Sequence, residues 1–180
     1  GTWLGNSRAG RFAALTNFRQ PENRTTVAPS RGALVSDFLA GTMTAEKYLD
    51  GLQTRAADYR GFNLLCGTLD DGLWHYANRG QAGETGHFMQ PLAPGIFGLS
   101  NNLLNVPWPK VAQGKSELAQ ALTALPHETP LFELLHDEKH YEDDRLPRTG
   151  ISIDWERTLS AAFVRAPGYG TRSSTVVKFD

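Results

Sequence analysis

Residues 62–80, FNLLCGTLDDGLWHYANRG, decide the fold that this chain is predicted to adopt. Two mostly apolar runs flank Asp70, Asp71 and Gly72, and an Asp-Gly pair between such runs is a strong short-range signal for a β-hairpin. The sequence therefore predicts two adjacent antiparallel strands in the middle of the chain.

A second hairpin is predicted at the start of the chain. The runs GTWLGNS and RFAALTNF flank a turn that contains Gly10, whose lack of a side chain permits a positive φ. Two amphipathic helices are expected between the hairpins, in residues 30–41 and 44–59, because apolar residues recur there at helical spacing. Gly41 is the expected end of the first helix, and Thr44 is the expected N-cap of the second.

The second half of the chain is predicted to mix short strands with helices. Strands are expected in residues 86–92, 95–102 and the terminal run STVVKF, and helices in residues 107–125, 130–141 and 154–164. Asp154 is the expected N-cap of the last helix. The strands come in antiparallel groups and do not alternate singly with helices, so the pattern favours an α+β fold.

Length and composition predict one domain, spanning residues 1–180, since 180 residues with 40% hydrophobic content suffice for a single core. A net charge of -1 gives no basic field for nucleic acid. No apolar run is long enough for a membrane span, and the start lacks the features of a signal peptide. The single cysteine, Cys66, suits a reducing compartment, so we expect a cytoplasmic protein.

Asn17 and Asn101 follow the same pattern: an apolar run, a hydroxyl residue and then asparagine where a strand is expected to end. One interpretation is turn chemistry, because asparagine side chains readily bond their own backbone at strand ends. The other is that both amides converge on a substrate carbonyl and stabilise a developing oxyanion. The residues alone favour the turn.

Arg172 and Tyr169 lie in the glycine-bracketed turn GYGTRSS near the end of the chain. The plainer interpretation of Arg172 is a surface arginine. The functional interpretation is a guanidinium held at the mouth of a site, with Tyr169 supplying a hydroxyl group beside it.

The histidines and the cysteine give weaker signals. His136 and His140 are predicted one helical turn apart in HDEKH, but a solvated helix end is the preferred interpretation, and no metal site is predicted. His75 and His87 lie among apolar residues, where an imidazole can be a plain strand residue or an axial ligand to haem. Cys66 is expected to be a buried, unreactive side chain.

Four ordered motifs resemble the NRDE family, also called the transport and Golgi organisation protein 2 family. They are GTWLGNSRAGRFAALTNFRQP, RGALVSDFL with YRGFNLLCG, GLSNN followed by PWPKV, and LPRTGISIDWERTLSAAFV with GYGTRSSTVV. The resemblance runs along essentially the whole chain.

The resemblance implies a layered α-β-β-α sandwich similar to the N-terminal-nucleophile hydrolases, in which a cysteine freed by loss of the initiator Met attacks an amide. Family members begin with Met-Cys and carry the tetrapeptide Asn-Arg-Asp-Glu before GTWLG, and this chain has neither. The first strands of the domain are therefore expected to be missing here, and this chain alone is expected to be inactive.

Comparison with the choloylglycine and penicillin V acylase branch of that fold singles out three residues. Asn17, Asn101 and Arg172 look like the two asparagines and the arginine of that site, so the resemblance makes Asn17 an oxyanion donor and moves the turn interpretation to second place.

Two functions stay open, together with a domain that has kept the fold without chemistry. The first is a cysteine-dependent amidohydrolase-like enzyme acting on a small-molecule amide, with Asn17, Asn101 and Arg172 as catalytic residues. The second is a non-catalytic protein that binds and carries haem, a lipid or acyl-CoA, with no resident cofactor. Its expected ligand contacts are Trp74, His75 and Tyr169, and its expected pocket is lined by Trp74, Tyr76, Phe88 and Phe97.

Overall fold

The computed structural model of the chain describes residues 2–20, 27–80 and 85–179. It divides into two compact units. The first comprises residues 1–95 with 99–104, and the second comprises residues 96–98 with 105–180.

The first unit is built on an antiparallel sheet with the strand order β1-β2-β3-β4-β5. Its strands are β1 (Leu4–Asn6), β2 (Arg11–Asn17), β3 (Phe62–Thr68), β4 (Gly72–Arg79) and β5 (Thr85–Leu92). Both predicted hairpins are confirmed, and their turns contain Gly10 at φ 71° and Gly72 at φ 75°. In this left-handed region glycine is favoured because other residues carry a Cβ that clashes.

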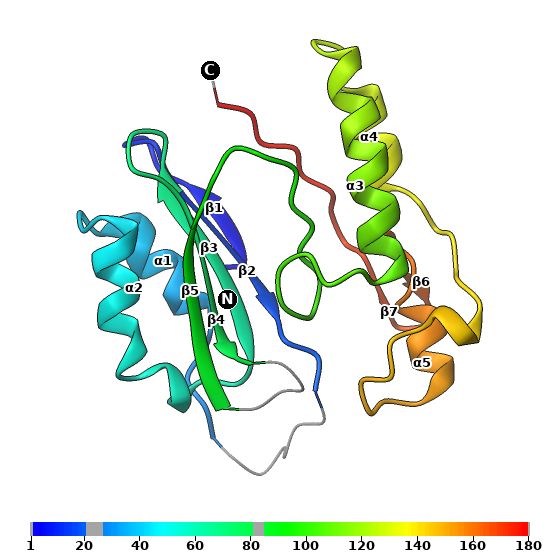
Figure 1. Cartoon of the computed structure of the whole chain (residues 1–180), viewed down its shortest axis with the longest axis horizontal. Helices are drawn as coiled ribbons and strands as arrows, with labels where there is room; N and C mark the ends of the chain where they lie inside the picture. Colours follow the sequence, from blue (N-terminus) through cyan, green and yellow to red (C-terminus); the bar gives the residue numbers. More distant parts are fainter. Residues whose placement is uncertain (1, 21–26, 81–84, 180) are drawn as a thin grey trace. The chain divides into compact units, whose positions relative to one another are not determined.

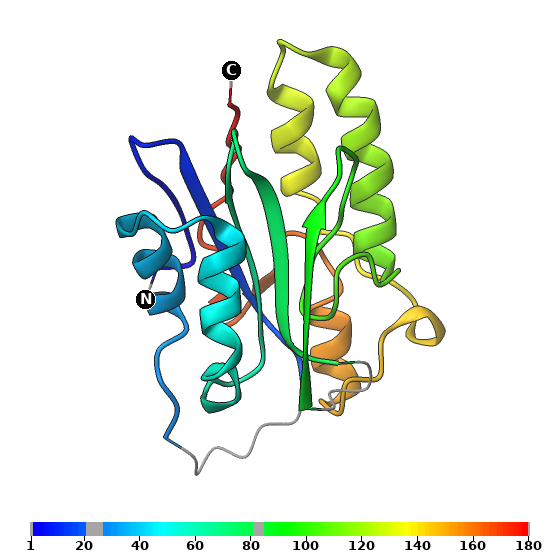
Figure 2. The ribbon, with the colours of Figure 1, turned by 60° about the vertical axis from the view of Figure 1, so that its left-hand side comes forward.

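Two helices, α1 (Gly32–Ala40) and α2 (Ala45–Gln53), cover one face of this sheet, as Figures 1 and 2 show. Both were predicted from helical spacing. Thr44 caps α2 by accepting a hydrogen bond from the Lys47 amide, and Gly41 ends α1 as expected. A short 3-10 helix, η1 (Ala56–Asp58), leads from α2 into β3.

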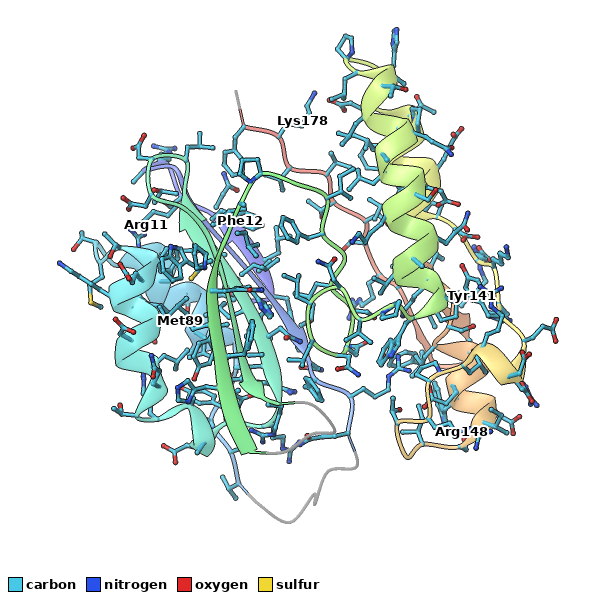
Figure 3. All side chains as sticks on the ribbon, in the orientation of Figure 1. Arg11, Phe12, Met89, Tyr141, Arg148 and Lys178 are labelled. Atoms are coloured by element: carbon cyan, nitrogen blue, oxygen red, sulfur yellow. The ribbon has the colours of Figure 1, made fainter. Side chains whose placement is uncertain are left out.

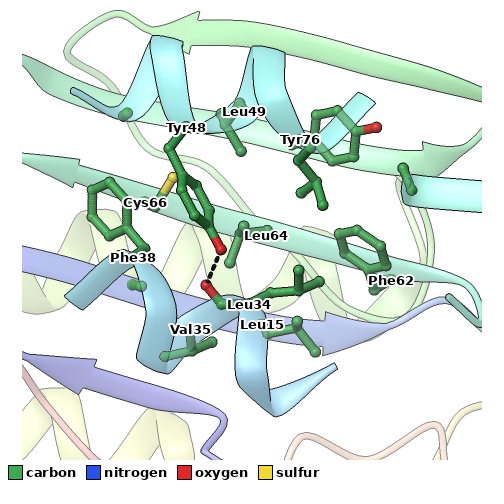
Figure 4. Packing of buried hydrophobic residues seen from close by; sticks show 14 of the residues in the cluster. Leu15, Leu34, Val35, Phe38, Tyr48, Leu49, Phe62, Leu64, Cys66 and Tyr76 are labelled. Atoms are coloured by element: carbon green, nitrogen blue, oxygen red, sulfur yellow. Dashed lines mark hydrogen bonds between the residues drawn. The ribbon is translucent and has the colours of Figure 1, made fainter. Parts of the chain in front are cut away.

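The hydrophobic core of this unit lies between the helices and the sheet (Figure 4). The Tyr48 hydroxyl group donates to the Leu34 carbonyl oxygen at 2.8 Å, so the aromatic side chain is buried with its polar end satisfied. The fully buried members of the core are Ala13, Leu34, Val35, Phe38, Ala45, Leu49, Leu52, Phe62, Leu64, Cys66 and Tyr76.

The second unit is mainly helical. Its α-helices are α3 (Pro109–Ala121), α4 (Thr129–Leu135) and α5 (Ile153–Thr158), its 3-10 helices include η3 (Leu122–Ala124) and η4 (Asp143–Arg145), and β6 (Arg165–Ala166) pairs with β7 (Tyr169–Gly170). None of the helices in the described part of the chain is long and apolar enough to cross a membrane.

Two strand predictions were wrong. Residues 95–102 form an irregular segment, in which the Asn101 carbonyl accepts from the Arg19 amide and not from a neighbouring strand. Residues 171–179 contain no strand either, and within the described residues β6 and β7 pair only with each other. Strand propensity is not enough where no partner strand completes the ladder.

Predictions about the ends of α4 and α5 were also wrong, and α5 stops at Thr158 although the helix was predicted to reach residue 164. Helix α4 ends at Leu135, so His136 and His140 do not lie on one helix, and the Asp137 carboxylate instead accepts from the Lys139 amide at 2.9 Å. Such a side-chain bond competes with helix continuation. The N-cap of α5 is Ser152 and not Asp154.

The α+β class is therefore confirmed. The second sheet of a four-layer sandwich and the single domain over residues 1–180 stay predictions.

Candidate functional site

The central sheet of the first unit has two chemically different faces. Successive side chains on a strand point to opposite faces, as the neighbours Arg11 and Phe12 on β2 illustrate (Figure 3). The Arg11 guanidinium lies on the helix-covered face and donates to the Phe38 carbonyl at 2.8 Å. The opposite face carries Thr16, Asn63 and His75, so a polar cluster forms away from the helices.

Asn17 ends β2, as predicted, but its side chain does not form a turn. Its Oδ1 is buried without a hydrogen-bond partner, and no described residue bonds the rest of its amide group. A buried acceptor left unpaired costs about 1–3 kcal/mol. An amide that is held at a strand end at this cost is suited to a ligand.

Asn101 is brought next to Asn17. Its Nδ2 donates to the Asn17 backbone carbonyl at 3.0 Å, and its own carbonyl accepts from the Arg19 amide at 2.7 Å. Asn101 thus holds the end of β2 through both its side chain and its main-chain carbonyl. The structure places the two asparagines together, with Asn101 bound to the backbone of Asn17.

Asn63 was not identified as a site residue from the sequence. Asn63 lies in β3 and is fully buried. Its amide group is hydrogen-bonded to three groups, which belong to β2, to β4 and to the irregular segment. Its Nδ2 donates to Thr16 Oγ1 at 3.2 Å and to the Asn102 carbonyl at 3.0 Å, while its Oδ1 lies 3.1 Å from His75 Nε2. The available signal was an amide side chain inside the apolar run FNLLC.

His75 is neutral and its tautomer is fixed by this cluster. The Asn102 carbonyl can only accept, so it orients the Asn63 amide with Nδ2 toward it and Oδ1 toward His75. His75 Nε2 must therefore carry the hydrogen, and Nδ1 keeps a lone pair that has no partner among the described residues. Burial lowers the pKa of His75 from 6.5 to about 4.

The other predicted ligand contacts of the first unit do not share one surface. Trp74 packs against the core on the helix-covered face, whereas its neighbour His75 points to the opposite face, where the Phe88 ring lies 6.3 Å away. The His87 ring stacks at 6.3 Å on Tyr76, a core residue. His75 and His87 therefore lie on opposite faces of the sheet.

Arg172 and Tyr169 belong to the second unit, as does Phe97. Arg172 is exposed in the segment that follows β7. Tyr169 is also exposed, and its ring meets Trp155 edge-on with 5.5 Å between centroids. Their roles at a site stay predictions.

Cys66 is a buried core residue, as expected, and burial raises the pKa of its thiol to about 12. A thiol that stays protonated is a poor nucleophile. No cluster of three or more metal-ligating side chains occurs within residues 2–20, 27–80 and 85–179.

Each unit also has a groove. In the first unit a groove of about 290 Å³ lies at the start of α1, beside Trp3, Arg31 and Arg60. In the second unit a groove of about 460 Å³ lies between α3 and α4 and is bordered by Glu117, Glu133 and Asp137. Neither groove is lined by a predicted site residue.

Comparison with known proteins agrees with the resemblance seen in the motifs. The family described as Transport and Golgi organisation 2 matches residues 1–180. The Transport and Golgi organization protein 2 homolog of Bos taurus is 38% identical over 196 residues, which cover 100% of this chain and 68% of that protein. The Homo sapiens homolog is 36% identical over 194 residues, with the same coverage of 100% and 68%.

Proposed function

Because the chain belongs to the Transport and Golgi organisation 2 family, we propose that it supplies the amide donors of an N-terminal-nucleophile amidohydrolase-like site. Asn17 donates a side-chain N–H to the carbonyl oxygen of a small-molecule amide and stabilises the charge that develops on attack. The observation that supports this proposal is the Asn17 amide, which is partly buried and bonded to no described residue.

The proposal gives Asn101 and Arg172 supporting roles. After its bond to Asn17, Asn101 Nδ2 retains a second hydrogen, which the proposal uses as another donor to the substrate. Arg172 orients the nucleophile or the substrate through its guanidinium group.

The nucleophile in this proposal is a cysteine outside residues 1–180. Cys66 is unsuitable because it is fully buried and its thiol is protonated at neutral pH. A free amino-terminal cysteine can use its own α-amine as the base. A reducing compartment such as the cytoplasm preserves such a thiol, so the proposal includes a cytoplasmic location.

The test is turnover of a library of small N-acyl amides by the natural full-length protein and its Asn17→Ala variant. Loss of one oxyanion donor is expected to lower kcat by about 10²- to 10³-fold. Asn6→Ala is the matched control, because Asn6 is an exposed asparagine that also ends a strand, and it should leave turnover unchanged. Equal turnover by wild type and Asn17→Ala would contradict the role of Asn17.

A second candidate is a carrier of an apolar ligand such as haem or acyl-CoA. It is favoured by one observation, the buried and unprotonated His75 Nδ1 beside the aromatic ring of Phe88. A neutral imidazole nitrogen is a good ligand for haem iron. In this proposal Tyr169 supplies a further contact with the ligand, whereas Trp74 lies on the opposite face of the sheet from His75 and does not share its surface.

Titration with haem tests the carrier. Binding through His75 should give a shift of the Soret band that is lost in His75→Gln but kept in His87→Gln, since these histidines lie on opposite faces of the sheet. An unchanged spectrum, or equal shifts in both variants, would rule out His75 as the iron ligand.

A further inference from the structure

We infer that Asn63 is a positioning residue for the proposed site at Asn17 and acts through residues 100–102 of the irregular segment. The inference deepens the proposed function and rests on it for its catalytic meaning. The physical link between Asn63 and Asn17 can be measured without a substrate.

The first link joins Asn63 to the irregular segment. Asn63 lies inside β3, whereas the segment has no ladder of its own, so the hydrogen bond from Asn63 Nδ2 to the Asn102 carbonyl at 3.0 Å ties it to a rigid strand. The amide cannot rotate away at low cost because its remaining groups are bonded to Thr16 and His75. The Asn102 carbonyl, which can only accept, sets the orientation of the Asn63 amide, and the Thr16 hydroxyl and His75 can both bond it in that orientation.

The second link joins the segment to Asn17. Residue 101, next in the chain to Asn102, binds the Asn17 carbonyl through Nδ2 and the Arg19 amide through its carbonyl. The Arg19 guanidinium and the Ser100 hydroxyl group lie 3.4 Å and 3.5 Å from Asn101 Oδ1 and fix the orientation of this amide. The backbone on both sides of residue 18 is therefore held in place.

Together these links explain how Asn17 can present an uncommitted side chain. The backbone of β2 is fixed around Asn17, so its amide group needs no bond of its own to keep its place. Removing the Asn63 amide would leave the Asn102 carbonyl and the His75 Nε2–H without partners, and the segment would then open more readily.

The sheet offers a matched control in Asn78. This residue is 3% exposed, and its amide is bonded as fully as that of Asn63: Nδ2 donates to the Ala56 and Tyr59 carbonyls, and Oδ1 accepts from the Phe62 amide. These partners lie at η1 and at the start of β3, and none of them belongs to residues 100–102. Asn78→Ala therefore disrupts an equally buried amide that makes no bond to residues 100–102.

The experiment is amide hydrogen exchange in the natural full-length protein and its Asn63→Asp and Asn78→Ala variants. Aspartate keeps the size of asparagine but has no N–H for the Asn102 carbonyl. The reporter is the Arg19 amide, two residues beyond the end of β2, and the reference is the Leu15 amide within β2, which donates to the Trp3 carbonyl. Asn63→Asp should lower protection at Arg19 about tenfold more than at Leu15, as expected for loss of one buried hydrogen bond.

In Asn78→Ala, protection at the two amides should fall by the same factor. The inference is overturned if Asn63→Asp also lowers the exchange protection of the Arg19 and Leu15 amides by the same factor, because Asn63 would then be only a stabilising residue. If Asn63→Asp does not fold, the wild-type protein is measured instead. Its Asn63 side-chain hydrogens and its Arg19 amide should exchange through one opening event, so the free energy of opening should depend on denaturant in the same way at both. Different dependences would reject the link.

Turnover separates this inference from the proposed function. If the inference and the proposed function both hold, Asn63→Asp lowers kcat with little change in KM, since the Asn17 amide that Asn63 positions acts on the transition state. If Asn17→Ala has no effect on turnover but the exchange result is as expected, the amidohydrolase proposal fails and the positioning role of Asn63 stands.

Discussion

His75 makes the stability of the protein depend on pH at the scale of a single residue. Its pKa is about 4 in the folded protein, whereas an exposed histidine titrates near 6.5. Between these values the unfolded chain binds a proton that the folded chain does not, so the free energy of unfolding falls as pH is lowered from 6.5 toward 4. Above pH 6.5 this contribution is constant.

The expected loss between pH 7 and pH 4.5 is about 2–3 kcal/mol, measured as the free energy of unfolding in urea. His75→Gln keeps a side-chain N–H donor but does not titrate, so the variant should lose less stability than wild type over the same range. A loss of the same size in both proteins would show that His75 is not the cause.

At this scale the sequence predicted part of the candidate site. Asn17 and Asn101 were identified because each ends an apolar run, and the structure brings them together. Asn63 was missed because an asparagine within a strand looks the same in sequence whether it faces water or a buried partner. The three groups that Asn63 bonds come from other parts of the chain, and their meeting depends on the tertiary fold.

At the scale of elements, Arg11 joins the sheet to the end of α1. Its Nε donates to the Phe38 carbonyl at 2.8 Å, its Nη2 donates to the Met43 carbonyl at 2.7 Å, and its Cζ lies 3.9 Å from the centroid of the Phe38 ring. A cation near the carbonyl end of a helix is favourable, and the planar guanidinium reaches both carbonyls at once.

Arg11→Lys keeps the charge but cannot reproduce this geometry, so it is expected to lower the free energy of unfolding by about 2 kcal/mol. Arg8→Lys, at an exposed position in the first turn, should change it by less than about 0.5 kcal/mol. Chemical denaturation of both variants is the measurement. A negligible effect at Arg11 would mean that its two bonds do not stabilise the contact with α1.

Two glycines in the first unit are expected to respond in opposite ways to replacement by alanine. A Cβ at Gly67 in β3 would lie 2.1 Å from the Gly72 carbonyl oxygen, so Gly67→Ala should destabilise by about 1–3 kcal/mol or more. A Cβ at Gly51 in α2 would meet nothing within 4 Å, so Gly51→Ala should stabilise by about 0.5–1 kcal/mol. Thermal unfolding of the pair tests both signs, and a destabilised Gly51→Ala would contradict the helical argument.

Local signals predicted the two hairpins and helices α1 and α2 better than the segments at 95–102 and 171–179. The hairpins and α1 and α2 carry their own turn residues and amphipathic spacing, so neighbouring residues suffice to specify them. The segments at 95–102 and 171–179 have apolar or β-branched residues that favour strands, but pairing depends on a distant partner. Helix α4 ended early because of a side-chain bond at Asp137.

At the scale of the whole molecule, the hydrophobic core cluster belongs to the first unit. All its buried members, from Ala13 to Tyr76, lie in residues 1–95, whereas the second unit has α-helices of 13, 7 and 6 residues and strands β6 and β7 of two residues each. Amides in packed central strands open only at a cost close to that of global unfolding. The two units should therefore differ in hydrogen-exchange protection.

We expect the slowest exchange in β3 and β4 and faster exchange in residues 136–152, which connect α4 to α5. Hydrogen exchange followed by mass spectrometry measures this difference peptide by peptide. Uniform protection along the chain would contradict it and would indicate that both units open in one cooperative step.

The two buried asparagines also have a consequence for misfolding. Asn63 and Asn78 are bonded on opposite faces of the β3–β4 hairpin, so the hairpin can satisfy both only in its native alignment. A slip of β4 by one residue would turn Asn78 away from the Ala56 and Tyr59 carbonyls and His75 away from Asn63. Misaligned hairpins would thus bury unpaired polar groups, which raises their free energy relative to the native alignment.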